Sequence, residues 1–250
     1  MSFSLNLPLN GVSFGQVSLL LMRAFFEKGI KPCLFPISGQ IDLSALNQDK
    51  QFFDYITECT NKAHREHSRD IPTFKLWHLN QGIDSFSRIN NLLTFYELDQ
   101  PTPTEINVAK NADKLFFTNK FSQEVFSQYG VESDLIPLAF DRYSFKKINK
   151  KFFDDERIVF NLCGKFEKRK HHHKIIEAWA KKFGNDKRYS LQCALWNHFI
   201  DEKRNKDNFV NSVSRKNYAN IQFLGHMKTN ELYNDFLNSG NIVIGMSGAE

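Results

Sequence analysis

Short apolar runs alternate with segments of helical periodicity along most of the chain. The run at 2–9 is followed by apolar residues spaced three and four apart from Val17 to Phe25, which places them on one face of a helix. The same pairing of an apolar run with an amphipathic segment recurs several times before residue 141. Such alternation is typical of β-α-β units, so the sequence predicts an α/β fold with a parallel sheet covered by helices.

The first half of the chain holds the clearest signals for individual elements. The expected strands lie at 2–9, 32–37, 73–79, 92–98, 114–118 and 135–139. Thr102 fits the N-cap of a helix, Pro103 its first position and Glu105 the third residue of a capping box, so a helix to about residue 112 is expected. Asn119 is expected to cap the next helix and Gly130 to end it.

The alternation stops over 142–155 and then restarts. This polar segment carries Lys146, Lys147, Lys150 and Lys151 and is typical of a connection between domains. Four more strands are expected, at 157–163, 189–196, 221–224 and 241–246. The two runs predict two doubly wound domains, over 1–141 and 156–250. The last strand lacks the covering helix that a parallel sheet needs, so we expect the second domain to be incomplete at Glu250.

Composition and charge narrow the function only a little. A net charge of +5 favours anionic partners without choosing among phosphates, nucleic acid and an acidic membrane. Because no nucleic-acid-binding motif is present, we expect no nucleic-acid partner. The four cysteines lie far apart, which indicates reduced thiols in a cytoplasmic protein. No signal peptide or membrane-spanning run is recognisable, and peripheral membrane contact through the lysine-rich segment stays an alternative to a solvated surface.

Two loops after predicted strands could hold an anion, since ligands of doubly wound sheets bind beyond the carboxyl ends of the strands. The loop NGVSFGQ at 10–16 has two glycines before a helix, and we take Gly15 as its donor-binding candidate. A tight structural turn would explain this loop equally well. In the loop GKFEKRKH at 164–171, Lys165 and Lys170 could converge on one diphosphate at a helix N-terminus. The alternative for this loop is a basic, solvated helix start.

The second loop and several other segments resemble family-4-type glycosyltransferases. GKFEKRKHHH, followed by IIEAW, is similar to the donor-phosphate loop of that family, and Lys165 and Lys170 match its two basic positions. The segments at 92–103 (LLTFYELDQPTP), 135–141 (LIPLAFD), 221–225 (IQFLG) and 247–250 (SGAE) agree with the family in order and spacing. The resemblance implies a GT-B fold of two Rossmann-like domains.

The resemblance also implies an activity, which is transfer of a sugar from a UDP- or GDP-sugar to a glycan, lipid-linked or other acceptor. It implies no metal ion, no further cofactor and retention of configuration. Glu250 would contact the donor sugar. Tyr96 stands where many relatives carry a histidine in the first-domain cleft, so Tyr96, Glu97 or Asp99, or else His78 from the preceding strand, would take the part of that histidine.

Two other functions are compatible with these residues. Glu97-Leu98-Asp99 nearly forms the Asp-x-Asp of metal-dependent GT-A-type transferases, and metal dependence would separate that class. The other alternative is a catalytically silent nucleotide-sugar-binding module of the same fold, because the cleft histidine is absent and the chain stops early. Donor binding without turnover would favour this alternative. The run His171-His172-His173 is not expected to bind a metal, since consecutive helical residues point in different directions.

Overall fold

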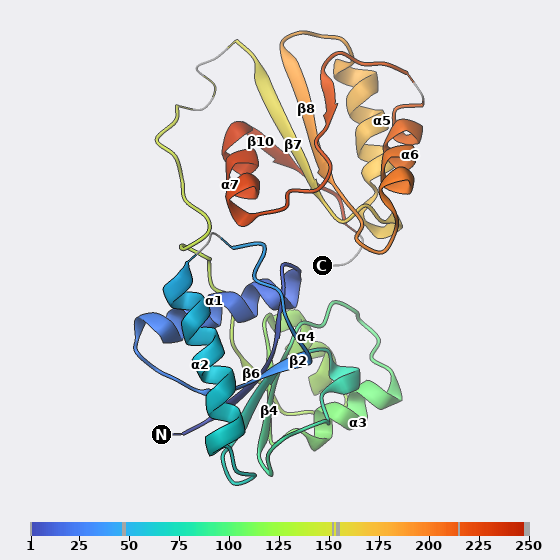
Figure 1. Ribbon diagram of the computed structural model, residues 1–250. Coiled ribbons are helices and arrows are strands. Elements are labelled where there is room, and N and C mark those ends of the chain that lie inside the picture. The colour runs from blue at the N-terminus through green and yellow to red at the C-terminus, as the bar shows by residue number, and fades with distance from the viewer. Residues whose placement is uncertain (1, 47–48, 152, 154–155, 215, 248–250) are drawn as a thin grey trace. The chain divides into compact units, whose positions relative to one another are not determined.

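The computed structural model describes residues 2–46, 49–151, 153, 156–214 and 216–247. The chain divides into two compact units, Met1–Tyr143 and Ser144–Glu250, which we call unit 1 and unit 2. Figure 1 shows that each unit contains a sheet with helices packed around it. None of the helices in the described part of the chain has both the length and the apolar character needed to cross a membrane.

Unit 1 contains a six-stranded parallel sheet in the order β2-β1-β3-β4-β5-β6. Its strands are β1 (Ser4–Leu9), β2 (Cys33–Ile41), β3 (Thr73–Leu76), β4 (Asn90–Thr94), β5 (Lys114–Phe117) and β6 (Asp134–Leu135). Its helices are α1 (Ser13–Glu27), α2 (Lys50–Glu66), α3 (Pro103–Asn111) and α4 (Lys120–Ser127), with a short 3-10 turn at Leu79–Gln81. The chain order reverses between β1 and β3, and the carboxyl ends of strands at such a point form the usual ligand crevice.

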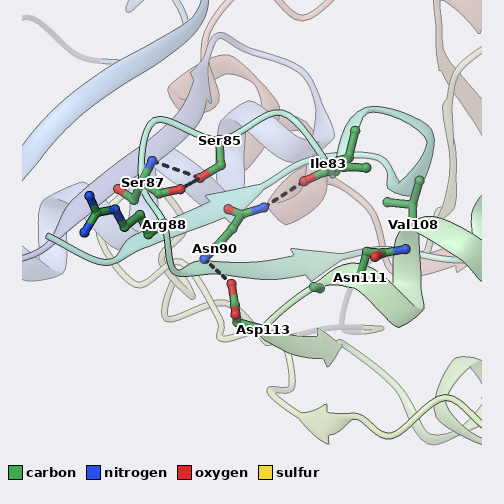
Figure 2. A pocket seen from close by; sticks show the side chains of 10 residues that line it. Ile83, Ser85, Ser87, Arg88, Asn90, Val108, Asn111 and Asp113 are labelled. Carbon is green, nitrogen blue, oxygen red and sulfur yellow. Dashed lines mark hydrogen bonds between the residues drawn. The ribbon is translucent and has the colours of Figure 1, made fainter. Parts of the chain in front are cut away.

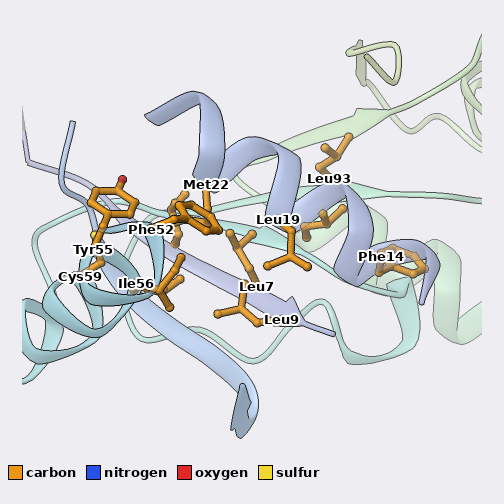
Figure 3. Packing of buried hydrophobic residues seen from close by; sticks show 13 residues of the cluster. Leu7, Leu9, Phe14, Leu19, Met22, Phe52, Tyr55, Ile56, Cys59 and Leu93 are labelled. Carbon is orange, nitrogen blue, oxygen red and sulfur yellow. The ribbon is translucent and has the colours of Figure 1, made fainter. Parts of the chain in front are cut away.

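Two buried clusters hold unit 1 together. The first joins leucines of β1 to apolar side chains of α1 and α2, among them Leu7, Met22 and Phe52, as Figure 3 shows. The second gathers around Phe117 and Phe126 beneath α3 and α4. Every residue of β1 is buried, which is the pattern of a central strand in a sheet covered on both faces.

Unit 2 contains a four-stranded parallel sheet in the order β10-β7-β8-β9. The strands are β7 (Ile158–Gly164), β8 (Tyr189–Leu195), β9 (Ile221–Phe223) and β10 (Ile242–Ile244), and the helices are α5 (His172–Phe183), α6 (Glu202–Ser212) and α7 (Asn230–Ser239). Its core contains Leu162, Ile176, Trp179 and Leu191. Here the chain order reverses between β7 and β10, so the crevice is expected beyond Gly164.

The lysine-rich segment before β7 is tied to α7 within unit 2. The amide of Asn238 donates to the carbonyl of Lys146 over 2.9 Å, and its oxygen accepts from the backbone N–H of Ile148 over 3.3 Å. Asn234 accepts from the backbone N–H of Lys146 over 2.8 Å. Backbone groups of this extended stretch are therefore satisfied by helix side chains and not by a sheet.

The structure confirms the α/β class and both predicted helix caps. Thr102 and Glu105 form the reciprocal capping box, and Asn119 accepts from the backbone N–H of Ser122. Several strand ends were predicted wrongly: β3 ends at Leu76 and β4 at Thr94, not at 79 and 98, while β2 runs on to Ile41. β6 covers two residues where five were expected, since only residues 134–135 pair with β5. An apolar run indicates burial, and residues stay buried beyond the last residue that pairs with a neighbouring strand. The strands predicted at 73–79 and 92–98 were therefore too long.

Candidate functional site

The carboxyl end of β7 is shaped by an unusual backbone conformation. Gly164 has φ +120°, a region that favours glycine, and a Cβ there would still keep 3.6 Å from Lys170 Cδ. The backbone conformation, and not crowding, is therefore what requires glycine. A 3-10 turn at Lys168–Lys170 follows, and His171, with φ +50°, leads into α5.

The loop after Gly164 carries a small network of opposite charges. Lys165 Nζ lies 3.0 Å from Glu167 Oε2, and Arg169 Nε lies 2.8 Å from Glu167 Oε1. Burial raises the pKa of Glu167, but the adjacent Lys165 and Arg169 lower it by more. The pKa of Glu167 therefore lies below its usual value of 4.5. Glu167 is thus a stable anion that holds two cations at the end of β7.

Lys165 and Lys170 are brought to the same strand end. Lys165 directly follows Gly164, and the aliphatic part of Lys170 passes beside the α-carbon of Gly164. Both residues are only partly buried. The geometry can present two positive charges to an anion that approaches the start of α5.

His172, the first residue of α5, is buried and electrically neutral at pH 7. Only 3% of its surface is exposed, and its Nδ1 has no hydrogen-bond partner among the described residues. Burial lowers the pKa of its imidazole to about 4, although a hydrogen bond with the backbone of Cys163 acts in the opposite direction. His172 therefore adds no charge to the loop, and its ring lies against Gly164 from inside the unit.

A group of aromatic and histidine side chains beyond β8 and β9 was not anticipated from the sequence. Trp196 stacks on His226 at 5.9 Å, His198 meets His226 edge-on at 4.5 Å, and Phe199, 82% exposed, lies 4.5 Å from Lys165 Nζ. The backbone N–H of Trp196 donates to the carbonyl of Gly164. The available signal was WNHF at 196–199, directly after a predicted strand, with His226 after the next one.

A second aromatic group lies at the carboxyl ends of the unit 1 strands, beside the point of reversal. Phe14 stacks on Phe95 at 4.1 Å and also contacts Trp77 at 5.7 Å and His78 at 4.5 Å. Burial lowers the pKa of His78 below 6.5, and the charge of Glu97 opposes that shift without cancelling it. His78 is therefore mostly neutral at pH 7 and can donate or accept one hydrogen bond at each ring nitrogen.

Tyr96 belongs to the other buried cluster of unit 1. Its ring meets Phe126 edge-on at 4.8 Å, its hydroxyl donates to Glu105 Oε2 over 3.4 Å, and only 6% of its surface is exposed. Burial, followed by the nearby Glu105, raises the pKa of Tyr96 to about 12. Tyr96 and His78 thus pack in different clusters, and Glu97 is the candidate whose charge reaches His78.

Gly15 is packed against its own chain. A Cβ at this position would come within 2.2 Å of both the backbone and the side-chain oxygen of Asn10. The side chain of Asn10 in turn accepts from the backbone N–H of Val12 over 3.1 Å. The glycine therefore permits a close approach within the turn. Glu250, the remaining donor-binding candidate, lies outside the described residues.

No metal centre is evident in the part of the chain that the structure describes, since no three His, Cys, Asp or Glu side chains gather there. Glu97 and Asp99 follow β4 in sequence, but no third ligand joins them among those residues.

Comparisons with known proteins agree with this architecture. No family model matches the chain, and no curated protein matches it either. Among solved structures, a glycosyltransferase from Rickettsia africae is similar over 98% of this chain and 73% of its own, with a TM-score of 0.62 and 10% identity. Anabaena HepE, solved with UDP and glucose, is similar over 98% of this chain and 74% of its own, with a TM-score of 0.55 and 15% identity.

A third similar structure is S. aureus TarM, solved with UDP and saccharide ligands. It has a TM-score of 0.51 and 9% identity over 71% of this chain. The chain spans only 37% of the length of TarM. At these identities the likeness is one of fold, and it shows that the two α/β units are Rossmann-like units of the GT-B type.

Proposed function

We propose that this chain acts in the transfer of a sugar from a UDP-sugar to an acceptor hydroxyl, without a metal ion and with retention of configuration. The observation that carries the proposal is the placement of Lys165 and Lys170 at Gly164, the carboxyl end of β7. This end lies where the strand order of unit 2 reverses, and α5 begins there. Such a position favours the binding of an anion, because the N–H groups at the start of the helix point toward it.

The chemistry that this loop supports is stabilisation of a leaving diphosphate. As the bond between sugar and phosphate breaks, negative charge builds on the β-phosphate. Two ammonium groups and the first turn of α5 would stabilise that charge, which is a preorganised electrostatic contribution. We propose that Glu167 orients Lys165 until the anion arrives. Glu250 is proposed to contact the donor sugar.

We propose the aromatic group beyond β8 as the platform for the nucleobase. Phe199 exposes most of its ring next to Lys165, so a base stacked there would leave its diphosphate near the lysines. UDP is the first nucleotide to test because HepE and TarM were both solved with UDP.

In unit 1 we propose that the acceptor side of the reaction uses His78. The neutral imidazole lies at the crevice edge of the sheet, with Glu97 close enough to influence its pKa. Tyr96 is proposed as a packing residue, since its hydroxyl is directed to Glu105 inside the unit. A catalytically silent donor-binding module is the second candidate function, and it differs in lacking any role for His78.

The proposal is tested by the thermal unfolding midpoint with UDP, GDP or ADP, each with EDTA and with Mg²⁺. We expect UDP to raise the midpoint in EDTA, because a ligand that binds only the folded state stabilises it. The rise should vanish in the Lys165→Ala/Lys170→Ala variant. Lys174→Ala is the matched control, since Lys174 is an exposed lysine on α5 just beyond the loop.

Each outcome decides something. A rise that requires Mg²⁺ favours the metal-dependent class, and a rise that the double variant retains refutes the assigned loop. Transfer is then followed as UDP release with sugar acceptors. If the wild type binds UDP but releases none from a UDP-sugar, the chain is the silent module. If the wild type releases UDP and His78→Ala does not, the transferase is supported.

A further inference from the structure

A small pocket lies at the opposite end of the unit 1 sheet from the aromatic group around Phe14. It forms where β4 and β5 begin, between the loop that precedes β4 and the end of α3 (Figure 2). Its volume is about 170 Å³, the space of roughly six water molecules. This is room for one six-membered ring with its substituents and too little for a nucleotide. The lining residues used below are Ile83, Arg88, Asn90, Val108, Asn111 and Asp113.

Asn90 forms part of the pocket wall and has one buried side-chain oxygen. Asn90 is 9% exposed, its amide nitrogen donates to the carbonyl of Gly82 over 2.8 Å, and its backbone N–H donates to Asp113 Oδ2 over 2.7 Å. Its Oδ1 has no partner among the described residues. The carbonyl of Gly82 requires a donor, so the amide nitrogen faces Gly82 and the oxygen is the side-chain group that remains. Because this oxygen has almost no solvent-accessible surface, it adds polarity to the pocket wall, and the accessible acceptors of the pocket come from Asp113 and Asn111.

The other polar groups around the pocket favour a ligand that donates. Asp113 uses one carboxylate oxygen for Asn90, which leaves the second for a ligand. The amide nitrogen of Asn111 is bound to the carbonyl of Asn107 over 2.7 Å, so its oxygen is the group left to accept. Arg88, paired with Asp70 over 2.7 Å, adds positive charge that disfavours a cation. The carboxylate of Asp113 disfavours an anion, so a neutral ligand with several hydroxyl groups fits best.

The remaining wall is apolar and held in place before any ligand arrives. Val108 and Ile83 offer carbon surface. A Cβ at Gly82 would lie 2.5 Å from Leu92 Cδ2, so this backbone packs directly on the core. Lys75, only 3% exposed, donates to the carbonyls of Gln81 over 2.6 Å and Asp84 over 2.9 Å, which fixes the loop. A preformed site loses little conformational entropy on binding.

We infer that this pocket binds one neutral, hydroxyl-rich ring of monosaccharide size. A sugar ring combines several O–H donors with a face of C–H groups, which matches an acceptor-rich pocket with an apolar wall. The site is separate from the loop after β7, so it does not depend on the proposed transfer. It would hold a sugar unit of a larger glycan or a free monosaccharide, and the two sources share this chemistry.

The test is saturation-transfer NMR on the full chain with methyl α-glucoside, N-acetylglucosamine, galactose and myo-inositol, then with a trisaccharide that contains the best binder. We expect transfer from at least one ring. Asp113→Asn keeps an oxygen for the backbone of Asn90 but loses the second acceptor, and should weaken binding roughly tenfold. Asn111→Ala should weaken it about fivefold. Both residues are exposed, so both variants should unfold at nearly the wild-type temperature.

Asn107→Ala is the matched control, because Asn107 is an exposed asparagine on α3 that does not line the pocket. Lys170→Ala is the second control and separates this site from the proposed donor loop. Binding that survives both pocket variants, or that falls equally in Asn107→Ala, overturns the inference. Absence of transfer from all four rings overturns it as well, and leaves a pocket filled by water.

Discussion

The two strand-to-helix turns at the points of chain reversal, β1 to α1 and β7 to α5, differ in what fills them. In the first, the space beside Gly15 is occupied by Asn10 of the same turn, and the loop NGVSFGQ carries no charged side chain. In the second, Gly164 is required by its backbone angle, Lys170 passes beside it, and Lys165 and Arg169 pair with Glu167 in the loop that follows. Topology places both turns at a ligand edge, but only the second has the charge to hold a phosphate.

The comparison teaches that glycine before a helix has more than one physical cause. Position 15 requires glycine because there is no space for a Cβ. Position 164 requires glycine because of its φ angle, and a Cβ there would make only ordinary contacts. Both would be read as phosphate loops from glycine content alone. The predictions below test this difference, beginning with the largest effect.

Gly15→Ala should destabilise unit 1 by about 3 kcal/mol, because the new methyl group would overlap two oxygen atoms of Asn10 and the start of α1 must shift. The measurement is the free energy of unfolding in urea. Gly245→Ala is the control, since its Cβ would meet nothing within 4 Å, and its cost should be small. If Gly15→Ala unfolds like the control, the turn is open and could again be considered as a ligand site.

The buried His172 should make the stability of unit 2 depend on pH. Its pKa is lowered from 6.5 to about 4 on folding, so the unfolded chain binds more protons between these values, and stability falls as pH drops from about 6.5 to about 4. The loss attributable to His172 should approach about 3 kcal/mol by pH 4. Urea unfolding of the wild type and His172→Leu across this range measures it.

His172→Leu replaces the titrating imidazole by an apolar side chain of similar size. The stability of this variant should therefore change less over the same pH range. His173→Leu is the matched control, because that neighbouring side chain is more exposed and its pKa is lowered less strongly. Parallel pH profiles for the wild type and His172→Leu would show that another group governs the acid response.

The sequence predicted what depends on neighbours along the chain. The capping box at Thr102 and Glu105 and the cap at Asn119 were correct because each needs only residues three positions apart. The prediction for the loop from Gly164 to Lys170 also rests on a local pattern, since a short stretch of sequence contains both lysines. Helix-strand alternation was enough to predict the α/β class.

What the sequence could not give depends on which strands pair. β6 is two residues long because pairing with Phe116 and Phe117 stops there, and no local pattern states that. Trp196 and His226 stack because β8 and β9 are neighbours in register, with Cys193 opposite Phe223. Tyr96 and His78 were equal candidates in the sequence, and only packing on Phe126 or Phe14 distinguishes them.

Glu167→Gln tests whether the charged loop after β7 binds an anion, because it removes the carboxylate that pairs with Lys165. If an anion competes with Glu167 for this ammonium group, the variant should bind UDP up to about fivefold more tightly, since a partly exposed ion pair contributes about 1 kcal/mol at most. Isothermal titration measures the affinity. Glu177→Gln, which removes an exposed pair with Lys181 on α5, is the control and should have no effect. Weaker binding would instead show that the orientation of Lys165 by Glu167 contributes more to UDP binding than their competition costs.

Tyr96→Phe should have the smallest effect. It removes one hydrogen bond of 3.4 Å to Glu105, which still accepts from the backbone and the hydroxyl of Thr102 over 2.7 and 2.8 Å. We expect a loss of about 0.5 kcal/mol in unfolding free energy and unchanged UDP release with an acceptor, because the ring still packs on Phe126. His78→Ala serves as the contrast in the same assay. If Tyr96→Phe loses turnover at wild-type stability while His78→Ala keeps it, the roles proposed for the two side chains must be exchanged.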